Sequence, residues 1–89
     1  MTISPDVKTA IEKNMELMLN QTKAYLPFLK LAFPLVKDLS EMTFNMMVGN
    51  AFTVFLSQSA MRLQIPSASD YVEFGQIVEV YRSKVKELF

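Results

Sequence analysis

Apolar residues recur with helical spacing in three stretches of the chain. In the first, steps of four and three join a set of apolar or small positions: Ile11, Met15, Met18, Thr22, Tyr25, Leu29, Ala32, Val36 and Leu39. Ser4 can cap a helix, Pro5 suits its first turn, and Asp6 lies at the positive end of the helix dipole. The pattern predicts a helix over residues 5–26.

Pro27 and Pro34 interrupt this first pattern. Each lacks an amide donor, and within a helix its ring clashes with the carbonyl four residues earlier. The sequence therefore predicts that the first helix is kinked or broken near these prolines. It leaves open whether the segment from Pro27 to Val36 is helix or loop.

A second helix is predicted over residues 37–64, with a packing seam whose spacing alternates between three and four. The seam consists of Leu39, Met42, Met46, Gly49, Thr53, Leu56, Ala60 and Leu63. Gly49 lowers helix propensity by about 1 kcal/mol relative to alanine. A close helix crossing is the preferred explanation for this glycine.

Large apolar residues of the second helix also lie outside its seam, namely Phe44, Met47, Phe52 and Phe55. The helix is thus apolar nearly all round its middle and needs cover on more than one side. We expect these four side chains to contact a partner or a hydrophobic surface. The uncharged run from Met42 to Met61 has the length of a membrane span, but amides and hydroxyls are spread through it, so integral membrane insertion is disfavoured.

The third helical stretch follows an interruption at Ile65, Pro66 and Ser67 and is predicted over residues 69–88. Ser67, Ser69 and Asp70 are all able to cap it, and the sequence does not choose among them. Its packing seam has heptad spacing and consists of Tyr71, Phe74, Val78, Tyr81, Val85 and Leu88. Acids come early in this helix and bases late, as the helix dipole prefers.

No stretch combines strand-like alternation with hairpin turns, so the fold class predicted is all-α. We expect an antiparallel bundle of three helices in a single domain over residues 1–89. The chain is 51% hydrophobic and has seven Phe and seven Met. A chain of this size buries only about 60–65% of its unfolded surface, so the surplus apolar area predicts self-association into a homo-oligomer.

The methionines allow two interpretations. Met15, Met18, Met42, Met46, Met47 and Met61 fall in the first two predicted helices. Flexible methionine side chains fill irregular gaps in small cores, and they also adapt to variable partner surfaces. Filling of the core is the more common use, and both interpretations are compatible with an apolar excess.

Charge narrows the range of partners and compartments. Nine basic and nine acidic residues cancel, and neither sign forms a long run. The chain therefore has no electrostatic footprint for nucleic acid or for anionic lipid. The first residues mix acids and bases where a signal peptide needs a basic end followed by an apolar run, so we expect a cytoplasmic protein.

Candidate chemistry is sparse. The chain has no Cys and no His, and its two glycines form no phosphate-binding loop. We therefore expect a non-enzymatic protein with no catalytic, cofactor-binding or metal-binding residues. Glu12 and Glu16 share a helix face, but a solvated face is preferred over a metal site because di-metal bundles add histidines. Tyr71 and Tyr81 could place hydroxyls in a pocket, although aromatic residues at heptad positions usually belong to the core.

The segment AMRLQIPSASDYVEFGQIVEVYRSKVKELF resembles the corresponding part of phasins, small helical proteins that coat polyhydroxyalkanoate granules. In that family a helix ends, a short Ser/Pro-containing linker follows, and an aromatic-acid-aromatic start leads into a Gln-containing helix. Here these places are occupied by Ser67, Asp70, Tyr71, Phe74 and Gln76. The resemblance covers about a third of the chain.

The resemblance implies that amphipathic helices lay their apolar faces on a polymer granule and expose charged faces to water, which limits coalescence of granules. A different class of function also fits the heptad spacing of the last helix. The chain would then be a small accessory or assembly subunit of a larger complex, or a self-associating helical bundle. A coat binds apolar particles with little stereospecific demand, whereas a subunit forms a complex of fixed stoichiometry.

Overall fold

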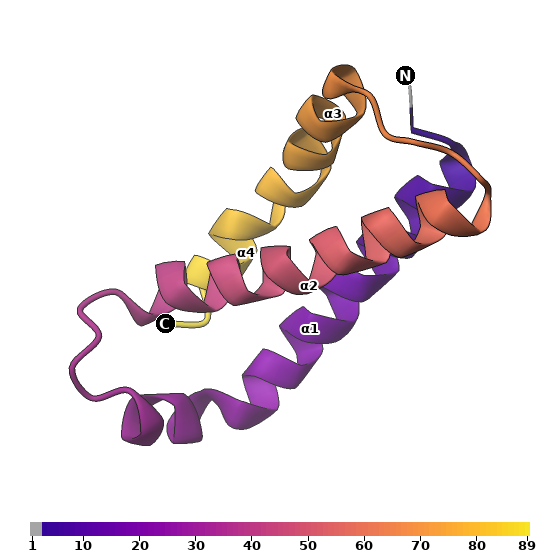
Figure 1. The fold of residues 1–89 in the computed structure, drawn as a ribbon. Helices are drawn as coiled ribbons and strands as arrows, with labels where there is room; N and C mark the ends of the chain where they lie inside the picture. Colours follow the sequence, from indigo (N-terminus) through magenta and orange to yellow (C-terminus); the bar gives the residue numbers. More distant parts are fainter. Residues whose placement is uncertain (1–2) are drawn as a thin grey trace.

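The computed structural model describes residues 3–89, and within that range the chain forms helices and no strand. The helices are α1 (Pro5–Ala32), α2 (Leu39–Met61), α3 (Ala68–Glu79) and α4 (Tyr81–Lys86). The two long helices α1 and α2 cross, and α3 and α4 run back over them so that α4 lies beside the start of α2 (Figure 1). The molecule measures 42 × 19 × 18 Å. The all-α prediction is confirmed.

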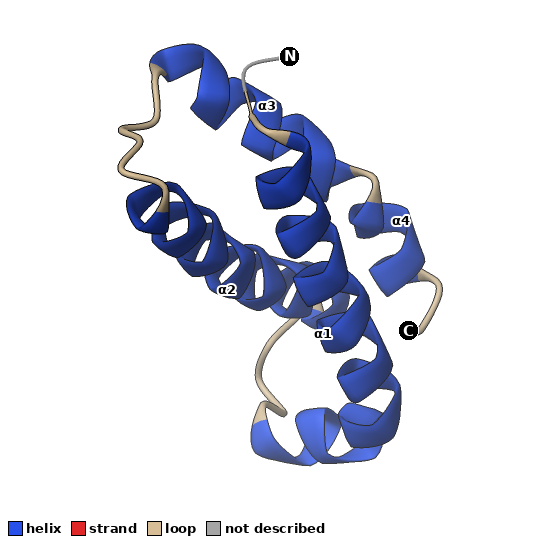
Figure 2. Ribbon diagram, turned by 90° about the vertical axis from the view of Figure 1, so that its right-hand side faces the viewer, coloured by secondary structure: helices blue, strands red, loops and turns tan. Residues whose placement is uncertain are grey.

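Helix α1 begins at Pro5, as the sequence predicts, because Ser4 caps it. The Ser4 hydroxyl accepts a hydrogen bond from the Val7 amide at 3.4 Å. The helix does not end at residue 26 but passes through Pro27 and continues to Ala32. Its last turns bend away from the axis of the rest (Figures 1 and 2). Proline removes one helical hydrogen bond and pushes away one carbonyl, so it kinks this helix without ending it.

The chain leaves the helical conformation at Phe33, which precedes Pro34. Phe33 has φ −128° and ψ 62°. A residue before proline is driven out of the α region by the proline ring. The segment from Pro27 to Val36, left open by the sequence, is therefore helix as far as Ala32 and loop beyond it.

Helix α2 starts two residues later than predicted because Asp38 is its N-cap. The Asp38 carboxylate accepts the Glu41 amide at 3.1 Å and the Ser40 hydroxyl at 2.7 Å. These hydrogen bonds, that of Ser40 first, lower the pKa of Asp38. The helix ends at Met61 rather than at residue 64.

The buried face of α2 differs from the predicted seam. The side chains on that face are Thr43, Phe44, Met47, Ala51, Phe55 and Ser59. By contrast, Met46, Leu56 and Leu63 of the predicted seam are exposed. Gly49 is exposed as well, and a Cβ added there would meet nothing within 4 Å, so a close helix crossing does not explain this glycine. The predicted seam is wrong for these residues.

The C-terminus of α2 forms a Schellman motif with a leucine where glycine is usual. The Gln64 amide donates to the Ser59 carbonyl at 2.9 Å, and the Leu63 amide donates to the Ala60 carbonyl at 3.0 Å. Leu63 has a positive φ of 55°, and its side chain is 95% exposed. A left-handed leucine without packing contacts stores local strain.

Replacing Leu63 with glycine is expected to stabilise the protein by up to about 1 kcal/mol, because glycine adopts positive φ without a steric penalty. The exposed leucine side chain contributes no packing that this change would remove. Urea unfolding measures the effect. Leu63→Ala is the matched control, since it removes the same side chain but keeps the strained Cβ. Equal stability of the two variants would contradict the assignment of strain.

The C-terminal helical stretch begins one residue earlier than predicted and divides into α3 and α4. Ser67 is the cap, because its hydroxyl accepts the Asp70 amide and the Asp70 carboxylate accepts the Ser67 amide at 2.8 Å. This capping box settles which of the three candidate residues caps the helix. Val80 separates α3 from α4 but keeps right-handed helical angles, φ −62° and ψ −17°. The predicted single helix over residues 69–88 thus has a local distortion, and α4 ends at Lys86.

The core forms where α1, α2 and the α3–α4 segment meet. Its buried apolar residues are Ile3, Val7, Ile11, Met15, Leu19, Phe44, Met47, Ala51, Phe55, Phe74, Val78, Tyr81 and Val85. On α1 these positions end at Leu19, and beyond it α1 contributes only the buried hydroxyl residue Thr22. The far end of α1 and the loop after it extend beyond the core.

Candidate interaction surface

The structure moves most of the predicted contact residues into the core. Phe44, Met47 and Phe55 are 3%, 1% and 1% exposed, so their placement on an outer contact surface is wrong. Phe52 is 37% exposed and lies at the edge of an aromatic cluster with Phe74, at 5.4 Å between ring centroids. An α2 that is apolar all round gives no periodicity from which to tell its inner face from its outer face.

The predicted packing seam of the last helix lies largely inside the molecule. Phe74, Val78, Tyr81 and Val85 are buried, and Leu88 packs partly buried against them. Tyr71 is the exception, since it is 41% exposed and contacts the ring of Phe55 edge-on at the margin of the aromatic cluster.

Arg82 fastens α4 to the start of α2. Its guanidinium pairs with Glu41 of α2 and with Glu79 of α3, and it lies 4.4 Å above the centroid of the Phe44 ring. Hydrogen bonds to Glu79 and Glu41 raise the pKa of Arg82 and keep it charged. These contacts make Arg82, the first base of the C-terminal stretch, part of the packing.

Tyr81 belongs to the core and does not present its hydroxyl in a pocket. The side chain is 4% exposed. Burial, and then the charge of Glu16, raise the pKa of Tyr81 from 10.0 to about 12. Glu16 itself lies 3.6 Å from the Lys84 ammonium, which favours an ion-paired face over a metal site with Glu12. Within residues 3–89 no three potential metal ligands gather at one place.

The shift at Tyr81 predicts loss of stability in alkali. In the unfolded chain Tyr81 ionises near pH 10, whereas in the folded protein it keeps its proton until about pH 12. Between these values the folded state binds more protons than the unfolded state, so the free energy of unfolding falls as the pH rises. Urea unfolding across this range measures the effect. The free energy of unfolding of Tyr81→Phe should fall less steeply with pH. An unchanged slope in that variant would contradict the assignment of the effect to Tyr81.

A run of exposed large apolar side chains lies at the far end of α1 and in the loop that follows it. We call residues 23–37 the proline tip. Its exposed large apolar side chains are Tyr25 at 59%, Phe28 at 63%, Leu31 at 77%, Phe33 at 39% and Leu35 at 94%. In Figure 1 the tip projects at lower left, away from α3. A small protein that exposes such a run has a surface suited to an apolar partner.

An apolar groove opens beside the proline tip, between α1 and α2. It has a volume of about 140 Å³ and is lined by Met18, Gln21, Thr22, Tyr25, Leu29, Thr43, Met46 and Met47. The Thr22 hydroxyl donates to the Met18 carbonyl at 2.8 Å, while the buried Thr43 hydroxyl has no hydrogen-bond partner among residues 3–89. Methionine side chains on both walls allow the groove to adapt its shape.

A second, smaller apolar surface lies at the other end of α2. This linker patch consists of Met61, Leu63 and Ile65, which are 75%, 95% and 94% exposed, respectively. Helix α2 has 23 residues between the two ends, which corresponds to about 34 Å at 1.5 Å per residue. The proline tip and the linker patch are therefore separate surfaces.

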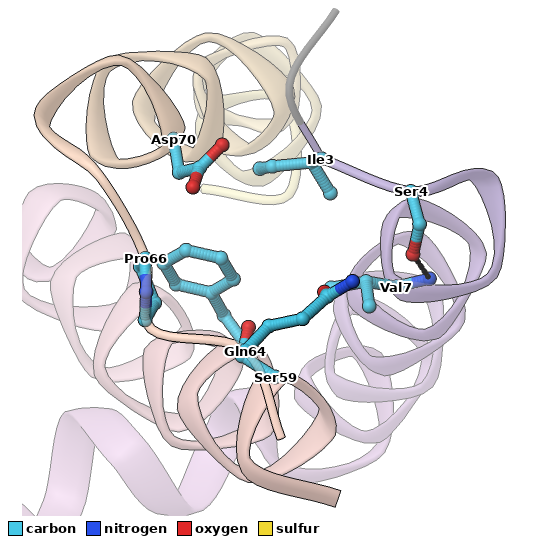
Figure 3. A pocket seen from close by; sticks show the side chains of 8 residues that line it. Ile3, Ser4, Val7, Ser59, Gln64, Pro66 and Asp70 are labelled. Carbon is cyan, nitrogen blue, oxygen red and sulfur yellow. Dashed lines mark hydrogen bonds between the residues drawn. The ribbon is translucent and has the colours of Figure 1, made fainter. Parts of the chain in front are cut away.

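The small cavity near the N-terminal end of α1 does not resemble a ligand site. It has a volume of about 20 Å³ and is lined by Ile3, Ser4, Val7, Phe55, Ser59, Gln64, Pro66 and Asp70. Figure 3 shows the polar side chains of Ser59, Gln64 and Asp70 around it. This space suits a single water molecule.

Sequence reasoning did not single out the side chains of the proline tip. Two signals in the sequence point to them: the dense run of large apolar residues in AYLPFLKLAFPLV, and the two prolines, which prevent that run from packing as one straight helix. Neither signal shows which side chains remain exposed, because exposure depends on how α1 bends relative to α2.

The fold and the exposed surfaces define a small all-helical protein with two apolar patches. None of the helices in residues 3–89 is long and apolar enough to cross a membrane. No family model matches the chain, and comparisons with curated proteins and with solved structures find no significant match.

Proposed function

We propose that this chain is a non-enzymatic interaction protein that coats a hydrophobic surface, and that the proline tip makes the contact. The observation that carries the proposal is the exposure of five large apolar side chains between Tyr25 and Leu35. Full burial of one such side chain contributes about 1.5–3 kcal/mol, before the costs of ordering. Several of them adsorbing together provide ample affinity for an apolar particle.

The resemblance of the C-terminal third to phasins supports a polymer granule as that particle. In this arrangement the core holds the helices together, the proline tip contacts the granule, and the charged faces of α1 and α4 remain in water. The absence of histidine and cysteine from the chain supports a binding role over catalysis.

A second candidate function, assembly with other copies or with a protein partner, is favoured by the outer face of α2. That face carries Met46 and Leu56 at heptad-compatible spacing, both are exposed, and the exposed Leu63 follows just after the helix ends. Leu63 also tolerates backbone strain in a position where glycine is usual. An exposed leucine held in a strained conformation suits a contact residue.

Sedimentation with uncharged polyhydroxybutyrate or oil particles separates the two candidates. The coat proposal expects the protein to leave the supernatant with the particles, to saturate their surface and to keep its helical circular dichroism. A protein that stays in the supernatant contradicts the coat proposal. If it also elutes as an oligomer of fixed size in light scattering, assembly through α2 becomes the better account.

A further inference from the structure

The lysines of this neutral protein are not evenly distributed around its apolar surfaces. Between Leu17 and Lys37 the chain has three lysines, Lys23, Lys30 and Lys37, and no Asp or Glu, a local charge of +3. All three lysines are exposed. None of them takes part in an ion pair within residues 3–89. The proline tip is therefore cationic as well as apolar.

The geometry of α1 places two of these charges, Lys23 and Lys30, along one border of the apolar surface, while Lys37 lies in the loop after the helix. Lys23 and Lys30 are seven residues apart and share a face of the helix. Phe28 and Leu31 lie about 80–160° around the helix from those lysines. An apolar arc bordered by lysines is typical of a helix that lies in a membrane interface, where long lysine side chains reach back to the headgroups.

The linker patch lacks this charge pattern. Its one base, Arg62, donates to the Gln58 side chain at 2.7 Å and lies 4.0 Å from the Asp6 carboxylate. A single base with an acid beside it gives little attraction for an anionic surface. Charge thus distinguishes the two apolar ends of the molecule.

We infer that the proline tip binds an anionic lipid surface, with Phe28, Leu31 and Leu35 in the boundary between headgroups and acyl chains and the three lysines against the headgroups. The inference rests on the proposed function, because it names the chemistry of the surface that the tip contacts. It differs from the expectation that the chain has no electrostatic footprint for anionic lipid, which rests on the balance of charges over the whole sequence.

Binding to vesicles tests this inference. Each lysine near an anionic surface is expected to strengthen binding about fivefold. The protein should therefore bind vesicles that contain phosphatidylglycerol about a hundredfold more tightly than vesicles of phosphatidylcholine alone. The difference should shrink as salt is added, because salt screens exposed charges.

A matched pair of variants locates the effect. The triple variant Lys23→Gln, Lys30→Gln and Lys37→Gln should lose the preference for phosphatidylglycerol. The control triple variant Lys8→Gln, Lys13→Gln and Lys84→Gln removes the same charge outside the proline tip and should keep most of this preference. Circular dichroism checks that both remain folded. Equal loss in the two variants would overturn the inference, because it would show a dependence on net charge alone.

The remaining outcomes distinguish this inference from the proposed function. Equal binding to both kinds of vesicle overturns the inference and leaves apolar adsorption intact. Binding to uncharged polymer or oil particles without binding to either vesicle also overturns the inference and leaves apolar adsorption intact. A protein that binds neither vesicles nor particles contradicts the inference and the proposed function together.

Discussion

Replacing Phe55 with alanine should destabilise the protein by about 3–5 kcal/mol, the range found for buried aromatic side chains. Phe55 is 1% exposed, and its ring stacks on Phe74 at 5.2 Å and contacts Tyr71 edge-on at 5.7 Å. A chain of this length has a total stability of about 4–13 kcal/mol. The variant should therefore unfold partly or completely under native conditions, as measured by urea denaturation and circular dichroism.

Phe52→Ala is the matched control for this prediction. It removes the same side chain three residues away on α2, where the ring is 37% exposed and lies at the margin of the same aromatic cluster. The loss of stability in Phe52→Ala should be clearly smaller than in Phe55→Ala, because part of the Phe52 ring already contacts water. If both phenylalanines faced outward, as the sequence pattern predicts, neither change would matter by more than about 0.5 kcal/mol. A loss for Phe52→Ala as large as that for Phe55→Ala would contradict the observed face of α2.

Helix starts were the features most accessible from the sequence, because a cap is a local signal. Ser4 with Pro5 marks the start of α1, and Ser67 with Asp70 forms the capping box of α3. In each case the deciding contact spans only three residues. Such contacts depend little on the rest of the fold, so the sequence placed the start of α1 at Pro5 and narrowed the cap of α3 to three residues.

The inner face of α2 was not accessible in the same way. Its buried side includes the small or polar residues Thr43, Ala51 and Ser59, whereas larger apolar residues such as Met46 and Leu56 face outward. Since large apolar residues lie on both faces of α2, a pattern that ranks positions by hydrophobicity does not tell the faces apart here. Small side chains on the inner face let α2 approach α1, and this gain depends on tertiary packing that the sequence pattern does not contain.

The candidate surface was missed for a related reason. The sequence marks residues 27–36 as the place where helical register fails, and Pro27 and Pro34 explain why. It does not show that α1 continues past Pro27 as a bent helix and carries Phe28 and Leu31 away from the core. The exposed apolar surface arises from a kink, whose direction is set by three-dimensional contacts rather than by spacing.

Replacing Leu31 and Leu35 together with serine should weaken adsorption to apolar particles at least about a hundredfold, since each buried leucine contributes about 1.5–3 kcal/mol. Leu31 is 77% exposed and Leu35 is 94% exposed. Their loss removes almost no packing from the folded protein, so stability should change by no more than about 0.5 kcal/mol per site. Binding isotherms from sedimentation with uncharged particles measure the first effect, and urea unfolding measures the second.

The linker patch provides the control for this last prediction. Leu63→Ser with Ile65→Ser removes two side chains that are 95% and 94% exposed, at the other end of α2. If the proline tip makes the contact, this control should bind particles nearly as well as the unchanged protein. Equal weakening in both variants would mean that adsorption uses total apolar surface without a preferred end. Weakening in the control alone would move the contact to the linker patch, where the strained Leu63 lies, and would contradict the role assigned to the tip.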